Sequence, residues 1–175
     1  APAEVPVSTI RRAQRADALL LARLAERTFR EAFAAVNTPE NMELHCRTTY
    51  GEDIQAAEIA DPDKVTLLCE VAGAAVGYAQ VRWGRTPAFV VARAPGEIQR
   101  IYVLAECHGK GVAHDLMDAC LREIAARGLE GRVELLLGGV DAVEVQVARL
   151  GEAADRAVDG GHLAFDTADD PVDHA

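Results

Sequence analysis

A glycine turn that leads straight into a long amphipathic segment carries the clearest chemistry in the sequence. Gly109, Lys110 and Gly111 stand directly before Val112, where apolar residues begin to recur at helical spacing. The first turn of a helix leaves backbone N–H groups without intrahelical partners, and the helix dipole adds partial positive charge there. Glycine has no Cβ, so an anion can approach those amides closely. The turn therefore predicts a phosphate or pyrophosphate site, to which Lys110 adds a formal positive charge.

The turn fits neither of the two commonest phosphate loops. The dinucleotide-binding fingerprint needs a third glycine where this chain has His114, and the Walker pattern needs Ser or Thr where it has Gly111. A tight strand-to-helix connection that binds nothing is the structural alternative.

The segments on either side of the turn predict a strand and a helix that would position it. Before the turn, a β-branched and aromatic run beginning at Glu97 is typical of a buried strand. After it, the helix is expected to end at Arg127, with Gly128 just beyond as a C-terminal signal. The apolar face of that helix consists of Val112, Leu116, Ala119, Cys120 and Ile124.

The run from His108 to Ala113 resembles the pyrophosphate loop of the GNAT superfamily of N-acetyltransferases. The motif of that family is Gln/Arg-x-x-Gly-x-Gly/Ala; Gly111 and Ala113 match it, and His108 replaces the usual first residue. The preceding strand over 100–103 is equally typical, and the resemblance extends over about residues 8–130.

The resemblance implies an α/β fold with a mixed, twisted sheet, splayed at its central strand and covered by helices on both faces. Acetyl-CoA would enter the splay, with its pantetheine chain along the backbone of the central strand and its pyrophosphate on the loop amides. The implied cofactor-binding residues are Ile101, Tyr102, Val103, His108, Gly109, Lys110, Gly111, Val112 and Ala113. A glutamate on this strand often serves as general base in the family, and Glu97 stands at the matching distance from His108.

The expected reaction is direct transfer of an acetyl group from acetyl-CoA to a primary amine. Glu97 would remove a proton from the ammonium group, and the N–H of Val103 would face the developing oxyanion, as the resemblance implies. No metal is expected, because the histidines show no His-x-x-x-His spacing. A non-catalytic acyl-CoA-binding or sensor domain is the main alternative, and a phosphate-binding interaction module unrelated to CoA is a third.

Composition indicates a single domain in a reducing compartment. The chain has 175 residues, half of them hydrophobic, which suits one domain over 1–175. The four cysteines form no Cys-x-x-Cys pair, and neither a signal peptide pattern nor a membrane-spanning apolar run is present, so a cytoplasmic location is expected. The net charge of −10 argues against a nucleic-acid partner. The expected partner is a small-molecule or peptide amine, with no membrane surface, and the resemblance is compatible with a homodimer.

The elements before the central strand are expected in the order β, α, α, α, β, β. Residues 1–7 predict a loose end, and Asp17 is expected to cap the first helix, whose apolar stripe includes Leu20. Gly77 interrupts a strand and indicates a bulge or close packing. The predicted elements are a strand at 8–13, helices at 18–33, 39–50 and 53–60, and a hairpin of strands at 64–71 and 75–83.

The C-terminal part, residues 131–175, departs from the family pattern. Strands are expected at 133–137 and 162–165 and a helix at 141–158. The tyrosine that many family members use as general acid has no counterpart, because no tyrosine follows Tyr102, and that side chain is expected to point away from the cofactor side. Two explanations stay open: the segment has diverged, or the gene sequence read between about 131 and 160 contains a frameshift.

Overall fold

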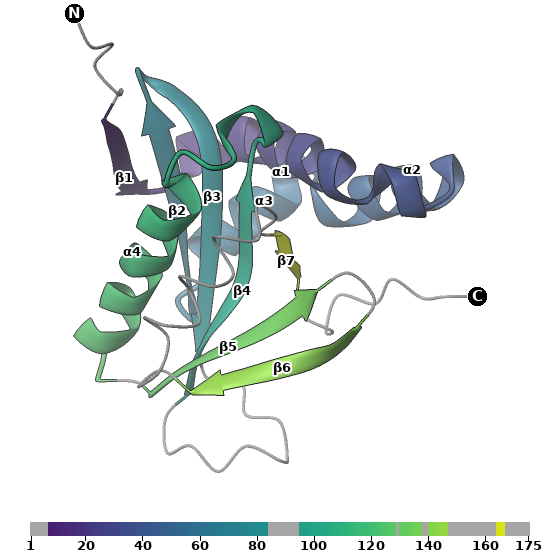
Figure 1. Cartoon of the computed structure of the whole chain (residues 1–175). Helices are drawn as coiled ribbons and strands as arrows, with labels where there is room; N and C mark the ends of the chain where they lie inside the picture. The colour runs from purple at the N-terminus through teal and green to yellow at the C-terminus, as the bar shows by residue number, and fades with distance from the viewer. Residues whose placement is uncertain (1–6, 84–94, 129, 138–139, 147–163, 167–175) are drawn as a thin grey trace, which may run out of the picture.

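The structure, a computed structural model (Figure 1), describes residues 7–83, 95–128, 130–137, 140–146 and 164–166. The order of elements predicted as far as the helix after the glycine turn is confirmed. The helices are α1 (Ala18–Phe33), α2 (Pro39–Thr49), α3 (Glu52–Ala60) and α4 (Val112–Ala126), with short 3₁₀ turns η1 (Arg15–Asp17), η2 (Ala34–Val36) and η3 (Ala105–Cys107). The strands are β1 (Ser8–Arg12), β2 (Lys64–Val71), β3 (Ala74–Trp83), β4 (Pro95–Val103), β5 (Glu130–Leu137), β6 (Val140–Gln146) and β7 (Ala164–Asp166).

The strands form one mixed sheet in the order β1-β2-β3-β4-β5-β6, with β7 paired to β4. Neighbouring strands are antiparallel except for β4 and β5, which run parallel. These two share residue pairs only between Pro95 and Ile98, and beyond Ile98 they diverge (Figure 1). The expected splay at the central strand is therefore present.

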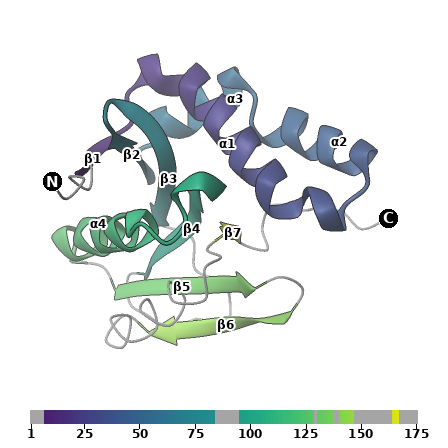
Figure 2. The same cartoon turned by 45° about the horizontal axis from the view of Figure 1, so that its top comes forward.

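Helices cover both faces of the sheet, as predicted. Figures 1 and 2 show α4 against one face, while α1 and α3 lie against the other. Leu116, Cys120 and Ile124 of α4 are buried at helical spacing, and Leu21 and Phe29 of α1 are buried on the opposite side of the sheet. The core thus has two layers, with the sheet between them.

Gly77 allows β3, β4 and α4 to pack closely, as its position in the sequence indicated. A Cβ built on Gly77 would lie 2.9 Å from the Tyr102 carbonyl oxygen and 3.1 Å from a methyl group of Leu116. The register of β2 against β3 also shifts beside it, between Cys69 and Glu70. Any larger residue at position 77 would push the backbone of β4 or helix α4 outward.

Two expectations for the first helix are wrong. Asp17 stands at the N-cap position of α1 but makes no cap hydrogen bond, because the preceding turn η1 gives it a helical backbone. Its carboxylate instead accepts from the Gln14 backbone N–H at 2.7 Å and from the Arg11 guanidinium at 2.8 and 2.9 Å. Leu20 is 40% exposed because it lies at the edge of the buried stripe that Leu21 belongs to.

The C-terminal predictions are confirmed only in part. β5 covers the strand expected at 133–137, and β7 overlaps the one expected at 162–165, whose first two residues lie outside the described residues. The helix expected at 141–158 is wrong where the structure describes it, because β6 is a strand. Val143 and Val145 alternate with polar residues there, a pattern that suits a pleated strand better than a helix. Residues 147–158 lie outside the described residues.

Candidate functional site

A bulge in β4 decides which side chains face which side of the sheet. Gln80 of β3 pairs with Arg100, while the next residue, Val81, pairs with Ile98, so Gln99 is an extra residue on β4. The extra residue reverses the alternation of side chains along the strand. Glu97 therefore lies on the same face as Arg100, the face covered by α1 and α3.

Glu97 is held by a two-point ion pair with Arg82, its cross-strand partner on β3. The Arg82 Nε lies 2.8 Å from Oε2 of Glu97, and Nη2 lies 3.3 Å from Oε1. Both side chains are largely buried, with exposed fractions of 6% for Arg82 and 12% for Glu97. Each carboxylate oxygen thus accepts one guanidinium N–H, and the charge of the predicted base is balanced inside the fold.

A second buried ion pair lies on the same face. Arg100 is 1% exposed, and its Nη1 donates to the Glu58 carboxylate of α3 at 3.0 and 3.3 Å. The same carboxylate accepts from Gln80 Nε2 at 3.2 Å and lies 3.6 Å from Lys64 Nζ. The Arg100 guanidinium also lies over the Tyr50 ring, 5.7 Å from its centroid. Sequence patterns alone did not identify either ion pair.

Tyr102 faces α1, as the alternation of the strand predicted. Its ring stacks on Tyr78 with centroids 5.7 Å apart and lies 6.4 Å from the ring of Phe29. Val103 lies on the other face, where its side chain comes close to Gly77 and α4. The contribution of Tyr102 to a cofactor site on the α4 side is therefore limited to its backbone.

The divergence of β4 and β5 is partly filled by β7. Residues Arg100, Ile101 and Tyr102 pair with Asp166, Phe165 and Ala164, in that order. The edge of β4 that was expected to pair with pantetheine at Ile101 is therefore paired with the chain itself in this structure. Among the residues that the structure describes, the pairs with β7 end at Tyr102, one residue before Val103.

The glycine turn presents a row of amides at the start of α4. Gly109 and Gly111 have φ angles of +74° and +82°, the left-handed region that favours glycine, and a Cβ at either position would meet no atom within 4 Å. Among the described residues, no hydrogen-bond acceptor is assigned to the N–H groups of residues 109–113. The helix itself begins with a bond from the Asp115 N–H to the Gly111 carbonyl at 3.0 Å. The turn and the helix start thus lie where the sequence placed them, and the phosphate site expected there stays a prediction.

His108 links the loop to the end of β4. Its Nε2 lies 2.9 Å from the Val103 carbonyl oxygen. A carbonyl can only accept, so Nε2 carries the proton in this contact. The residue that departs from the family motif therefore fastens the loop to the central strand.

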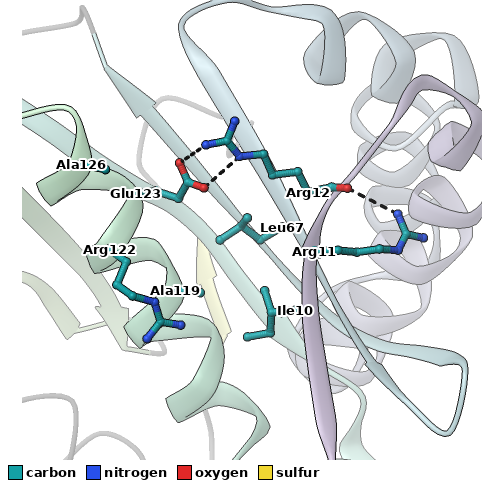
Figure 3. Close-up of a pocket in the computed structure, with 8 residues that line it drawn as sticks. All are labelled: Ile10, Arg11, Arg12, Leu67, Ala119, Arg122, Glu123 and Ala126. Atoms are coloured by element: carbon teal, nitrogen blue, oxygen red, sulfur yellow. Dashed lines mark hydrogen bonds and ion pairs between the residues drawn. The ribbon is translucent and has the colours of Figure 1, made fainter.

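The described residues also line an open pocket of about 350 Å³ between β1 and α4 (Figure 3). The Arg12 guanidinium pairs with Glu123 beside it at 2.8 Å. The pocket lies by β1, the first strand of the sheet, and no predicted site residue lines it. Its lining residues are Ile10, Arg11, Arg12, Leu67, Ala119, Arg122, Glu123 and Ala126.

Within the part of the chain that the structure describes, no group of three or more His, Cys, Asp or Glu residues could hold a metal ion. Burial raises the pKa of the Cys69 thiol to about 11 and that of Cys120 further, so neither thiol ionises at neutral pH. None of the helices in the described ranges combines the length and apolarity needed to cross a membrane.

Comparisons with known proteins identify relatives of this fold. The model of the acetyltransferase (GNAT) family matches residues 21–150. The PaiA N-acetyltransferase from Thermoplasma acidophilum in complex with coenzyme A has a TM-score of 0.65 at 16% identity, over 86% of this chain and 88% of that one. The aminoglycoside N-acetyltransferase AAC(6')-Iy in complex with CoA has a TM-score of 0.57 at 12% identity, over 95% of each chain.

A third solved structure is also named as an N-acetyltransferase. The ribosomal-protein-alanine N-acetyltransferase from Brucella melitensis biovar Abortus 2308 has a TM-score of 0.55 at 18% identity, over 87% of this chain and 90% of that one. At these identities the solved structures show the fold alone. No curated protein matches the chain in sequence.

Proposed function

The chain belongs to the acetyltransferase (GNAT) family, and on that basis we propose that it transfers the acetyl group of acetyl-CoA to a primary amine. The observation that carries the proposal is the row of amides over residues 109–113 at the start of α4, which follows the end of β4 that has parted from β5. This arrangement suits a pyrophosphate at the start of a helix. The amine is a small molecule or the end or side chain of a peptide.

The loop fits the pyrophosphate better than the strand edge fits pantetheine. The N–H groups of residues 109–113 would hold the phosphate oxygens, and Lys110, which is exposed, is placed to add charge. Pairing of pantetheine with Ile101 requires β7 to leave the edge of β4, whereas no described residue of β7 pairs with Val103. The proposal therefore includes a shift of β7 when acetyl-CoA binds.

Glu97 is the proposed general base. Its carboxylate would take a proton from the substrate ammonium, directly or through water, so that the free amine attacks the thioester carbonyl. Arg82 fixes the carboxylate in one position. In this proposal the guanidinium stays beside Glu97 while the carboxylate takes up and releases the proton. The Val103 N–H would face the oxyanion that forms, before the C–S bond breaks and the acetyl group stays on the amine.

The proton for the departing thiolate is proposed to come from water. The tyrosine that often supplies it in the family has no counterpart here, since no tyrosine follows Tyr102 in the chain. Tyr102 itself is buried against Tyr78 on the face covered by α1.

A cytoplasmic location is proposed with this activity, because all four cysteines are free thiols.

A non-catalytic acyl-CoA sensor is the second candidate function. It is favoured by one observation, the full pairing of Glu97 with Arg82, which leaves both carboxylate oxygens engaged. Titration calorimetry with acetyl-CoA tests binding, and thiol release from acetyl-CoA with a panel of amines tests turnover. Binding with release supports the transferase, binding without release for every amine class supports the sensor, and no binding overturns both.

A further inference from the structure

Helix α1 holds the corner between β4 and the glycine loop through a side chain. The backbone N–H of Ala105, the first residue of η3, donates to Oε2 of Glu31 at 2.8 Å. The neighbouring amides use backbone acceptors: Leu104 donates to Val76 at 2.9 Å and Cys107 donates to Leu104 at 2.8 Å. The amide of Ala105 thus depends on a carboxylate supplied by a distant part of the chain.

Arg27, one turn earlier on α1, completes this contact. Its Nε donates to Oε1 of Glu31 at 3.1 Å, so each oxygen of that carboxylate has its own donor. Its Nη2 reaches Oε2 of Glu106, the next residue of η3, at 3.2 Å. The spacing of four residues places Arg27 and Glu31 on one face of the helix.

We propose that Glu31, supported by Arg27, is a positioning residue for the cofactor loop; this inference rests on the proposed function. Ala105 lies four residues before Gly109, and the η3 turn between them passes any displacement to the loop amides. Fixing Ala105 to α1 limits the conformations open to the loop before the cofactor arrives, and preorganisation of this kind strengthens binding.

The arrangement also connects the two sides of the proposed site. Helix α1 continues through η2 into α2, and the resemblance to the GNAT family implies that this helical pair lines the acceptor side of the cleft. A displacement of α1 when the amine binds would therefore change the position of η3 and of the loop. The Arg27–Glu106 pair lies at the exposed rim, where Glu106 is 64% exposed, so Glu31 is expected to contribute more than Arg27.

The test compares Glu31→Ala with Glu26→Ala. Glu26 is the matched control because it makes the same type of pair on α1, with Arg30 at 2.8 Å, but makes no described contact with η3. Glu31→Ala is expected to weaken acetyl-CoA binding about three- to tenfold by calorimetry and to raise KM for acetyl-CoA with kcat nearly unchanged. Glu26→Ala is expected to bind like the wild type, and both variants should unfold at similar denaturant concentrations.

Glu31→Gln supplies the conservative variant, because its amide oxygen can still accept from the Ala105 N–H. It is expected to recover most of the affinity lost in Glu31→Ala, and the Ala105 amide should exchange with solvent faster only in the alanine variant. Equal acetyl-CoA affinities for Glu31→Ala and Glu26→Ala would overturn the inference, as would a loss that Glu31→Gln does not reduce. Failure of the wild-type chain to bind acetyl-CoA would instead refute the proposed function.

Discussion

Replacement of Gly111 separates the conformational cost of the loop from its contribution to ligand binding. The chain provides a matched control in Gly73, which lies in the turn between β2 and β3 with φ +79°, against +82° for Gly111. A Cβ at either position would contact no atom within 4 Å, so alanine costs only the left-handed backbone penalty. That penalty is about 1–2 kcal/mol of the free energy of unfolding for each variant.

The two variants should differ in ligand binding. Gly73 is not among the residues expected to hold the cofactor, and Gly73→Ala should bind acetyl-CoA like the wild type. Gly111→Ala should weaken binding at least threefold, because relief of the strained φ angle moves the amides at the start of α4. Gly111→Asp adds a carboxylate that, about 5 Å from one phosphate charge, costs about 3 kcal/mol at an effective dielectric constant of ~20. Screening by salt reduces that figure, so a loss of more than tenfold is expected.

Calorimetry with acetyl-CoA and with desulfo-CoA, at low and at physiological salt, measures these affinities, and urea unfolding measures stability. The Gly111→Asp loss should shrink as salt rises, while the Gly111→Ala loss should not. If both Gly111 variants bind as tightly as Gly73→Ala, the loop amides do not hold the pyrophosphate, and the assignment of the site is refuted.

Three further substitutions test the base, the packing of the sheet and the acid sensitivity of the fold. Glu97→Gln should keep acetyl-CoA affinity but lower kcat, most visibly at low pH where the amine is protonated; wild-type rates would reassign the base. Gly77→Ala should lower the free energy of unfolding by about 1–3 kcal/mol, because its Cβ would meet the Tyr102 carbonyl; unchanged urea unfolding would contradict the close packing. The hydrogen bond from Arg11 lowers the pKa of Asp17 below its usual 3.8, so the stability it contributes is present above that value and is lost as pH falls through the lowered pKa. Asp17→Asn should therefore lose less stability than the wild type on acidification below pH ~4, and parallel acid-unfolding curves would show that the pair contributes nothing.

The strand, loop and helix around the glycine turn were predictable because their signals are local. The identity of Gly109 and Gly111 suffices to indicate a turn with left-handed φ angles. The helix from Val112 onward is indicated by apolar residues within a few positions of one another. The hairpin turn at Gly73 and the cap at Thr38, whose side chain accepts from the Asn41 N–H, are local in the same way.

The features that the sequence did not predict depend on how the strands pair and on which side chains they bring together. The pairing of Glu97 with Arg82 depends on the register of β4 against β3, which no short window contains. Asp17 was expected to cap α1, but the path of β1 brings Arg11 beside its carboxylate instead. The helix expected from residue 141 is replaced by a strand because residues 140–146 pair with β5, a contact that the segment itself does not contain.

The extra residue at Gln99 has a consequence for how sequence change can act on this protein. Before Gln99, odd-numbered positions of β4 face α1 and α3, and after it even-numbered positions do. The alternation of side chains between the two faces of the sheet is therefore shifted by one residue at Gln99. Loss of that single residue would leave a regular ladder, in which Ile98 still pairs with Val81 and the Glu97 carboxylate still lies beside the Arg82 guanidinium. A change that drew Gln99 into the ladder opposite Val81 would instead turn Glu97 to the face covered by α4 and uncouple the candidate base from its counterion, with the length of the strand unchanged.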